Sequence, residues 1–160
     1  MPSLIPAAAT ITPSAAARPA TRRGALLLAV VAIGTLVLGA CNSADESTNY
    51  SAINSLRSSV GVPALARSGE LDAKARKQAE RMAKRGSIYH STNLAAGVSP
   101  GWTLIGENVA SAGTVEDAQG ALVASPPHYE NLTNPAFTEV GVGVYAKNGT
   151  VYVVQIFVAR

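Results

Sequence analysis

The sequence predicts an α+β domain that has helices in its first two thirds and a β-hairpin at its end. Apolar residues recur at helical spacing over residues 70–85. Near the C-terminus, residues 140–145 alternate valine with glycine or tyrosine, and residues 151–158 are β-branched and aromatic. Helices followed by an antiparallel hairpin are typical of a fold in which helices pack on one sheet.

The first 40 residues have the composition of an export signal. Residues 1–23 contain three arginines and no acidic residue, and residues 24–40 are uncharged and largely apolar. The motif Leu38-Gly39-Ala40-Cys41 resembles the bacterial lipobox, in which the cysteine receives a lipid such as palmitate and becomes the new N-terminus. The alternative is an uncleaved membrane helix, although the apolar run is shorter than the roughly 20 residues that span a bilayer. We expect a signal peptide at 1–40 and a protein outside the cytoplasm, anchored in the cell membrane by Cys41.

The charge balance after this signal argues against a nucleic-acid partner. The chain has a formal net charge of +3, but three of its 13 basic residues precede Cys41. The ten that follow balance the ten acidic residues, so the remainder is neutral and has no basic footprint. Cys41 is the single cysteine, so no disulfide can form inside the domain.

The remaining elements follow in order along the chain. Residues 41–49 are short and polar, which predicts a flexible tether before a domain at 47–160. Helices are expected at 48–60, 70–85 and 114–124, with a helical turn at 128–132. The charged side of the second helix is expected to face solvent. Residues 87–101 are typical of a loop, residues 102–110 of a strand or turn, and Asn148-Gly149 of a hairpin turn.

Three residues are candidates for a functional site: the two histidines of the chain and one acidic residue in an apolar stretch. His90 and His128 each adjoin a segment rich in proline and glycine, and Glu107 interrupts an apolar stretch. A carboxylate there is either an exposed residue at a strand edge or a buried group with a partner. Two histidines with a carboxylate are plausible ligands for zinc or another divalent cation. Their separations of 17 and 21 residues match no local metal motif. The three could equally form a hydrogen-bonded structural cluster.

Five segments in a fixed order resemble bacterial members of the CAP superfamily, also called SCP domains, which includes cysteine-rich secretory proteins, antigen 5 and pathogenesis-related proteins. The resemblance covers residues 47–158. The segments are His90-Ser91, Gly106-Glu107-Asn108-Val109-Ala110, Ser125-Pro126-Pro127-His128, Asn131 to Gly143, and Tyr152 to Phe157.

The resemblance implies an α-β-α sandwich, with helices on a small antiparallel sheet and a central cleft. It places His90, Glu107 and His128 in that cleft as metal ligands, supported by Asn108 and Ser125. Ser125 stands where many members have a second acid, so the ligand set is incomplete. The family also implies a lipid, a sterol or an envelope protein as partner.

Three functions therefore remain open at the level of sequence. The first is a non-catalytic binding module in the cell envelope, favoured because no activated nucleophile is apparent. The second is a metal-dependent hydrolase acting on peptide or envelope material, with Glu107 as ligand or general base. The third is a purely structural surface domain.

Overall fold

The computed structural model describes residues 40, 41 and 43–160, so all but the last residue of the signal peptide expected at 1–40 lies outside the described residues. The order of elements is β1 (Ala40–Cys41), α1 (Ser43–Ser59), β2 (Ala66–Arg67), α2 (Gly69–Arg85), β3 (Leu104–Ala112), α3 (Val115–Ala124), α4 (Pro126–Thr133), β4 (Glu139–Lys147) and β5 (Thr150–Ala159). No helix in this described part is both long and apolar enough to span a bilayer.

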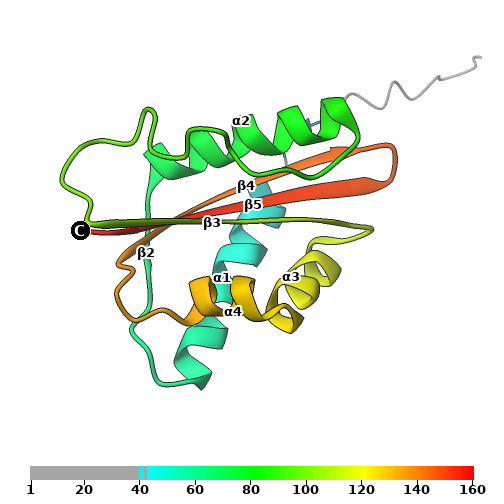
Figure 1. Cartoon of the computed structure of the whole chain (residues 1–160). Coiled ribbons are helices and arrows are strands. Elements are labelled where there is room, and N and C mark those ends of the chain that lie inside the picture. Colours follow the sequence, from blue (N-terminus) through cyan, green and yellow to red (C-terminus); the bar gives the residue numbers. More distant parts are fainter. Residues whose placement is uncertain (1–39, 42) are drawn as a thin grey trace, which may run out of the picture. The chain divides into compact units, whose positions relative to one another are not determined.

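The elements form three layers, which confirms the α+β sandwich. The sheet has the order β1-β4-β5-β3, and β3, β5 and β4 are joined by long antiparallel ladders. α2 covers one face, whereas α1, α3 and α4 cover the other (Figure 1). The short β2 pairs in parallel with β4, so the sheet is mixed at this edge.

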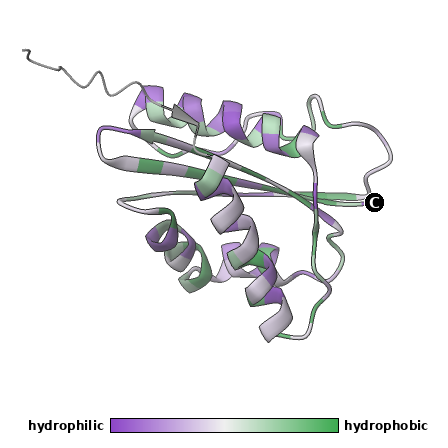
Figure 2. Ribbon diagram, turned by 180° about the vertical axis from the view of Figure 1, so that it is seen from behind, coloured by the Kyte–Doolittle hydropathy of each residue, from purple (hydrophilic) through white to green (hydrophobic). Residues whose placement is uncertain are grey.

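Each face of the sheet has its own apolar core. Val140, Val142 and Val144 point into the core shared with α1, α3 and α4. The opposite core contains the apolar stripe of α2, including Leu71 and Met82, both fully buried. In Figure 2 the strands between the layers are largely hydrophobic and α2 carries many hydrophilic residues. The alternating pattern seen in the sequence therefore separates the two cores.

The glycines of β4 allow α2 to lie against the strand. A Cβ atom on Gly141 would come within 2.2 Å of the Leu71 backbone, and one on Gly143 within 2.2 Å of the Ala75 backbone. The hairpin turn also forms as expected. Asn148 and Gly149 both have positive φ, at 51° and 75°, which is the conformation that an Asn-Gly turn supplies.

The prediction of a flexible tether at 41–49 is wrong for residues 43–49. They form the first turns of α1, which begins five residues earlier than expected. The physical reason is the burial of polar side chains with partners. Glu46 is fully buried and forms ion pairs with Arg76 and Arg67, while Asn49 is buried against Gln119 and Gln155.

Candidate functional site

The candidate site lies at the free edge of the sheet, beside β3. The segment between α2 and β3 carries His90, β3 carries Glu107, and the first turn of α4 carries His128. Successive residues of a strand point to opposite faces. Glu107 therefore points toward the segment that follows α2, and Asn108 points toward the layer of α4. The edge strand thus connects both sides of the site.

Glu107 is buried, with 2% of its side chain exposed, and its carboxylate is held by three hydrogen bonds. The Ser91 backbone N–H donates to Oε1 at 2.8 Å, and the Ser91 hydroxyl donates to Oε2 at 2.6 Å. Nδ1 of His90 lies 2.9 Å from Oε1. A buried carboxylate is stable only with such partners, and Glu107 has two of them, Ser91 and His90.

Ser91 is the functional neighbour that sequence reasoning missed. The His90-Ser91 pair was noted in the sequence, but the dipeptide does not indicate which residue Ser91 contacts. In the structure its backbone N–H and its hydroxyl both donate to Glu107, 16 residues later. The contact closes the loop after α2 onto β3. Ser91 therefore fixes both the loop and the carboxylate.

Contact with Glu107 fixes the tautomer of His90. A carboxylate only accepts hydrogen bonds, so Nδ1 of His90 must be the protonated nitrogen. The side chain of His90 is 59% exposed. The remaining nitrogen, Nε2, is thereby left as the basic atom of the neutral ring. This is the arrangement in which a carboxylate orients a histidine from behind.

His128 is held by the start of its own helix. Ser125 is the N-cap residue of α4, and its Oγ lies 2.9 Å from Nδ1 of His128. Pro126 and Pro127 occupy the first positions of the helix and have no N–H to cap, so the serine is available to the imidazole. Partial burial, and then the charge of His90, lower the pKa of His128. The two histidines are therefore close enough to repel each other when both are charged.

Asn108 fastens α4 to the sheet. Its Nδ2 donates to the carbonyl of His128 at 3.1 Å and to Oε1 of Gln155 at 3.2 Å, and its Oδ1 accepts from Asn131 at 2.9 Å. Asn108 is fully buried. A Cβ on Gly106 would lie 3.0 Å from Oδ1 of Asn131, so glycine gives this network room.

The network continues across the domain through Gln155, whose Nε2 donates to Asn49 and Gln119 at 2.7 Å. One buried polar atom in the described part of the chain, Nε2 of Gln119, has no partner. The chain of amides links α1, α3, β5 and β3 to the backbone of His128. The position of that histidine is thus set by the interior of the domain.

The structure brings His90 and Glu107 into contact and places His128 near them, but it does not form the three-ligand set. Among residues 43–160, no three histidine, cysteine or acidic side chains are arranged to hold a metal ion. Both oxygens of Glu107 are engaged by Ser91 and His90. Their roles as metal ligands stay a prediction, as does the lipidation of Cys41, whose backbone pairs with Tyr145.

Comparison with known proteins places the fold in a known group. Residues 50–157 match the family model described as CAP, the cysteine-rich secretory protein family. An extracellular SCP-domain protein from Bacillus anthracis matches with 26% identity and a TM-score of 0.65. The match covers 73% of this chain but 41% of that protein, so the present chain corresponds to only part of it.

Two further solved structures share the fold. An outer surface protein of Borrelia burgdorferi matches with 22% identity and a TM-score of 0.65, covering 77% of this chain and 99% of that one. The crystal structure of NaASP2 with Zn²⁺ matches with 18% identity and a TM-score of 0.56, covering 73% and 80%. No curated protein sequence matches this chain significantly.

Proposed function

Because the chain belongs to the cysteine-rich secretory protein family, we propose that it is an exported, lipid-anchored module that binds an envelope component without chemical turnover. The observation that carries this proposal is the engagement of Glu107. The buried carboxylate of Glu107 makes three hydrogen bonds within the protein, which suits a rigid support for His90. The exposed His90 and the half-buried His128 then form the surface that meets a ligand.

Glu107 is poorly suited to act as a general base in the alternative, a metal-dependent hydrolase. Three of its roughly four lone-pair sites accept hydrogen bonds from Ser91 and His90, and its side chain is 2% exposed, so little of the carboxylate is open to a water molecule. Ser125 and His128 form a second polar pair, but Ser125 contacts Nδ1, and no described carboxylate bonds to Nε2. That pair thus lacks the third group that orients a catalytic histidine.

The experiment that tests binding uses the chain purified from its own membrane. Bound lipids and other small molecules would be extracted and identified by mass spectrometry, beside a His90→Ala/His128→Ala double variant and a Lys84→Gln control on α2. We expect a ligand in the wild type and the control, and its loss in the double variant. Turnover of a broad peptide and ester panel with zinc, lost in Glu107→Gln, would instead support the hydrolase.

A divalent cation is part of the proposal in a limited form. Nε2 of His90 is free of the Glu107 contact, and His128 can present Nε2 when its Nδ1 donates to Ser125. Two imidazoles make a weaker site than the four ligands of a structural zinc. Calorimetric titration with zinc should give saturable binding that the double variant loses. Unchanged binding in that variant would remove the cation from the proposal.

The lipid anchor is supported by the lipobox and by where the fold begins. α1 starts two residues after Cys41, so a lipid on this cysteine would hold the domain directly at the membrane surface. The matched proteins from Bacillus anthracis and Borrelia burgdorferi are described as extracellular and as an outer surface protein. Metabolic labelling with palmitate should mark the wild type and not Cys41→Ser, and only the wild type should partition into detergent. Equal labelling of both would refute the anchor.

A further inference from the structure

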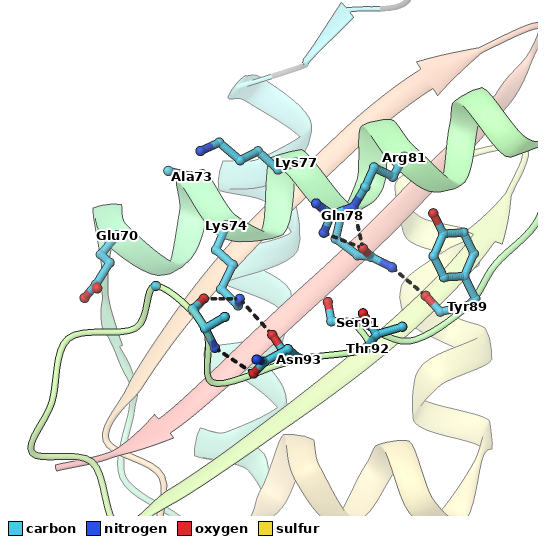
Figure 3. A pocket seen from close by; sticks show the side chains of 12 residues that line it. Glu70, Ala73, Lys74, Lys77, Gln78, Arg81, Tyr89, Ser91, Thr92 and Asn93 are labelled. Carbon is cyan, nitrogen blue, oxygen red and sulfur yellow. Dashed lines mark hydrogen bonds between the residues drawn. The ribbon is translucent and has the colours of Figure 1, made fainter.

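A pocket of about 690 Å³ lies on the outer side of α2, between that helix and the segment 89–97 (Figure 3). The helix contributes residues spaced by three and four, among them Lys74, Lys77 and Arg81, and the segment contributes Tyr89, Ser91 and their neighbours. The charged side of this helix was expected to face only solvent. The loop instead covers part of it.

The charges that line this pocket are unbalanced. Three cationic side chains face one carboxylate, that of Glu70. Glu70 is already engaged. Its Oε1 accepts from the backbone N–H and hydroxyl of Ser99 at 2.6 and 2.9 Å, and its Oε2 lies 3.6 Å from Nη2 of Arg160. The pocket therefore has an excess of positive charge.

None of the three cations forms a close ion pair with an acidic side chain in the described part of the chain. Lys74 donates to the carbonyl of Ala96 at 2.6 Å, and Arg81 donates twice to Oε1 of Gln78 at 2.7 and 3.0 Å. Lys77 is exposed and makes no hydrogen bond or ion pair with residues 43–160. These contacts orient two of the cations without neutralising them.

Lys74 shows the electrostatic consequence. Partial burial lowers the pKa of its ammonium group, the negative charge of Glu107 raises it, and the positive charge of Arg81 lowers it. Lys74 and Arg81 therefore repel each other across a partly desolvated space. A bound anion would relieve this repulsion and would meet charged donors that are already held in place.

We propose that this pocket binds a phosphate group. A phosphate monoester carries up to two negative charges and presents three terminal oxygens, so it can meet three separate cations, whereas a carboxylate has one charge and two oxygens. The phosphodiester of a lipid headgroup carries one charge, and its two ester oxygens are further acceptors beside its two terminal oxygens. The source can be an anionic lipid headgroup or a soluble phosphate monoester. The inference goes beyond the proposed function, because it involves neither the two histidines nor Cys41. Ser91 lines the pocket and holds Glu107, so the pocket borders the candidate site.

The test is nuclear magnetic resonance titration of the full chain in uncharged detergent micelles, with a chelator present to remove metals. One arm adds inorganic phosphate, a second adds phosphatidylglycerol or phosphatidylcholine to the micelles, and a third adds acetate. We expect saturable shifts at the backbone amides of Lys77, Arg81 and Thr92. Saturation with inorganic phosphate identifies a soluble ligand, and saturation only with phosphatidylglycerol identifies a headgroup.

Two charge-removing variants and one matched control complete the test. Arg81→Gln should weaken phosphate binding about tenfold, the effect of losing one charge-assisted hydrogen bond, and Lys77→Gln should weaken it less. Lys84→Gln removes the same charge as Lys77→Gln from the same helix, but Lys84 lies outside the pocket and pairs with Glu80, so binding should be unchanged. Equal effects of Lys77→Gln and Lys84→Gln, binding of acetate as tight as that of phosphate, or no saturable shift would overturn the proposal. None of these results would bear on the binding proposed for His90 and His128.

Discussion

Replacing Gly143 with alanine should destabilise the domain strongly, because the new Cβ would enter the backbone of α2. It would lie 2.2 Å from both the Ala75 carbonyl carbon and the Arg76 nitrogen, and 2.6 Å from the Ala75 oxygen. Ordinary contact begins near 3.4 Å, so helix and strand must separate by about 1.2 Å. These are backbone atoms, so no side-chain rotation can relieve the overlap.

The separation would loosen the packing of the whole α2 stripe. Overpacking a core costs roughly 1–3 kcal/mol, and a clash with backbone belongs at the upper end, so we expect a loss of about 3 kcal/mol. For a domain of this size that corresponds to a fall in Tm of about 10 °C. Urea unfolding followed by circular dichroism, together with a thermal scan, would measure both.

Gly120→Ala is the matched control. Gly120 lies in α3, where a Cβ would meet no atom within 4 Å, and its φ is not positive. The same substitution there should stabilise the domain by about 0.5–1 kcal/mol through helix propensity. If Gly143→Ala unfolded at the same urea concentration as the wild type, the close packing of α2 on β4 would be refuted.

Three further predictions follow from the polar interior and the site. Glu46→Gln should lower the free energy of unfolding by about 2–3 kcal/mol, because it breaks a buried ion-pair network. Glu80→Gln loses only an exposed pair with Lys84 and should change that free energy little. Equal urea midpoints for the two variants would contradict this prediction. Asn108→Ala should lower the free energy of unfolding by about 2 kcal/mol, because α4 loses its attachment to the sheet. The same loss should broaden the imidazole resonances of His128 in the NMR spectrum. Unaltered resonances would argue against that attachment. The pKa of His128 is lowered below its ordinary 6.5, so the unfolded chain binds more protons just below that pH. Stability in a chelator should therefore fall as the pH drops below 6.5, and His128→Gln should reduce this fall; an identical pH profile in the variant would refute it.

Patterns with a short period predicted most of the fold. The stripe of α2, the alternation in β4 and the Asn-Gly turn each depend on neighbours within a few residues, and all three form. The structural role of Gly141 and Gly143 was not predictable from the sequence. Their alternation with valine indicated a strand, but only the structure shows that the glycine face receives the backbone of a helix.

The site was predictable in its residues and not in its contacts. An acid within an apolar stretch indicates either an exposed residue at a strand edge or a buried carboxylate with a partner, and Glu107 is the second of these. The identity of that partner depends on where a loop of about 18 residues returns to the sheet, and no local pattern encodes this. The sequence left two roles open for Glu107, a metal ligand or a member of a hydrogen-bonded cluster, and the structure engages its carboxylate with Ser91 and His90.

Glu46 shows the same limit at the N-terminal end of the domain. Residues 42–49 are polar, and polar composition usually indicates a segment that cannot repay the entropy of ordering. Here the polar groups are matched: Arg67 and Arg76 neutralise Glu46, and their positions are set by β2 and α2. A carboxylate five residues after Cys41 is thus fixed to the core. If a lipid is attached to that cysteine, the folded domain is held close to the membrane surface, because α1 begins two residues after the anchor and is part of the core.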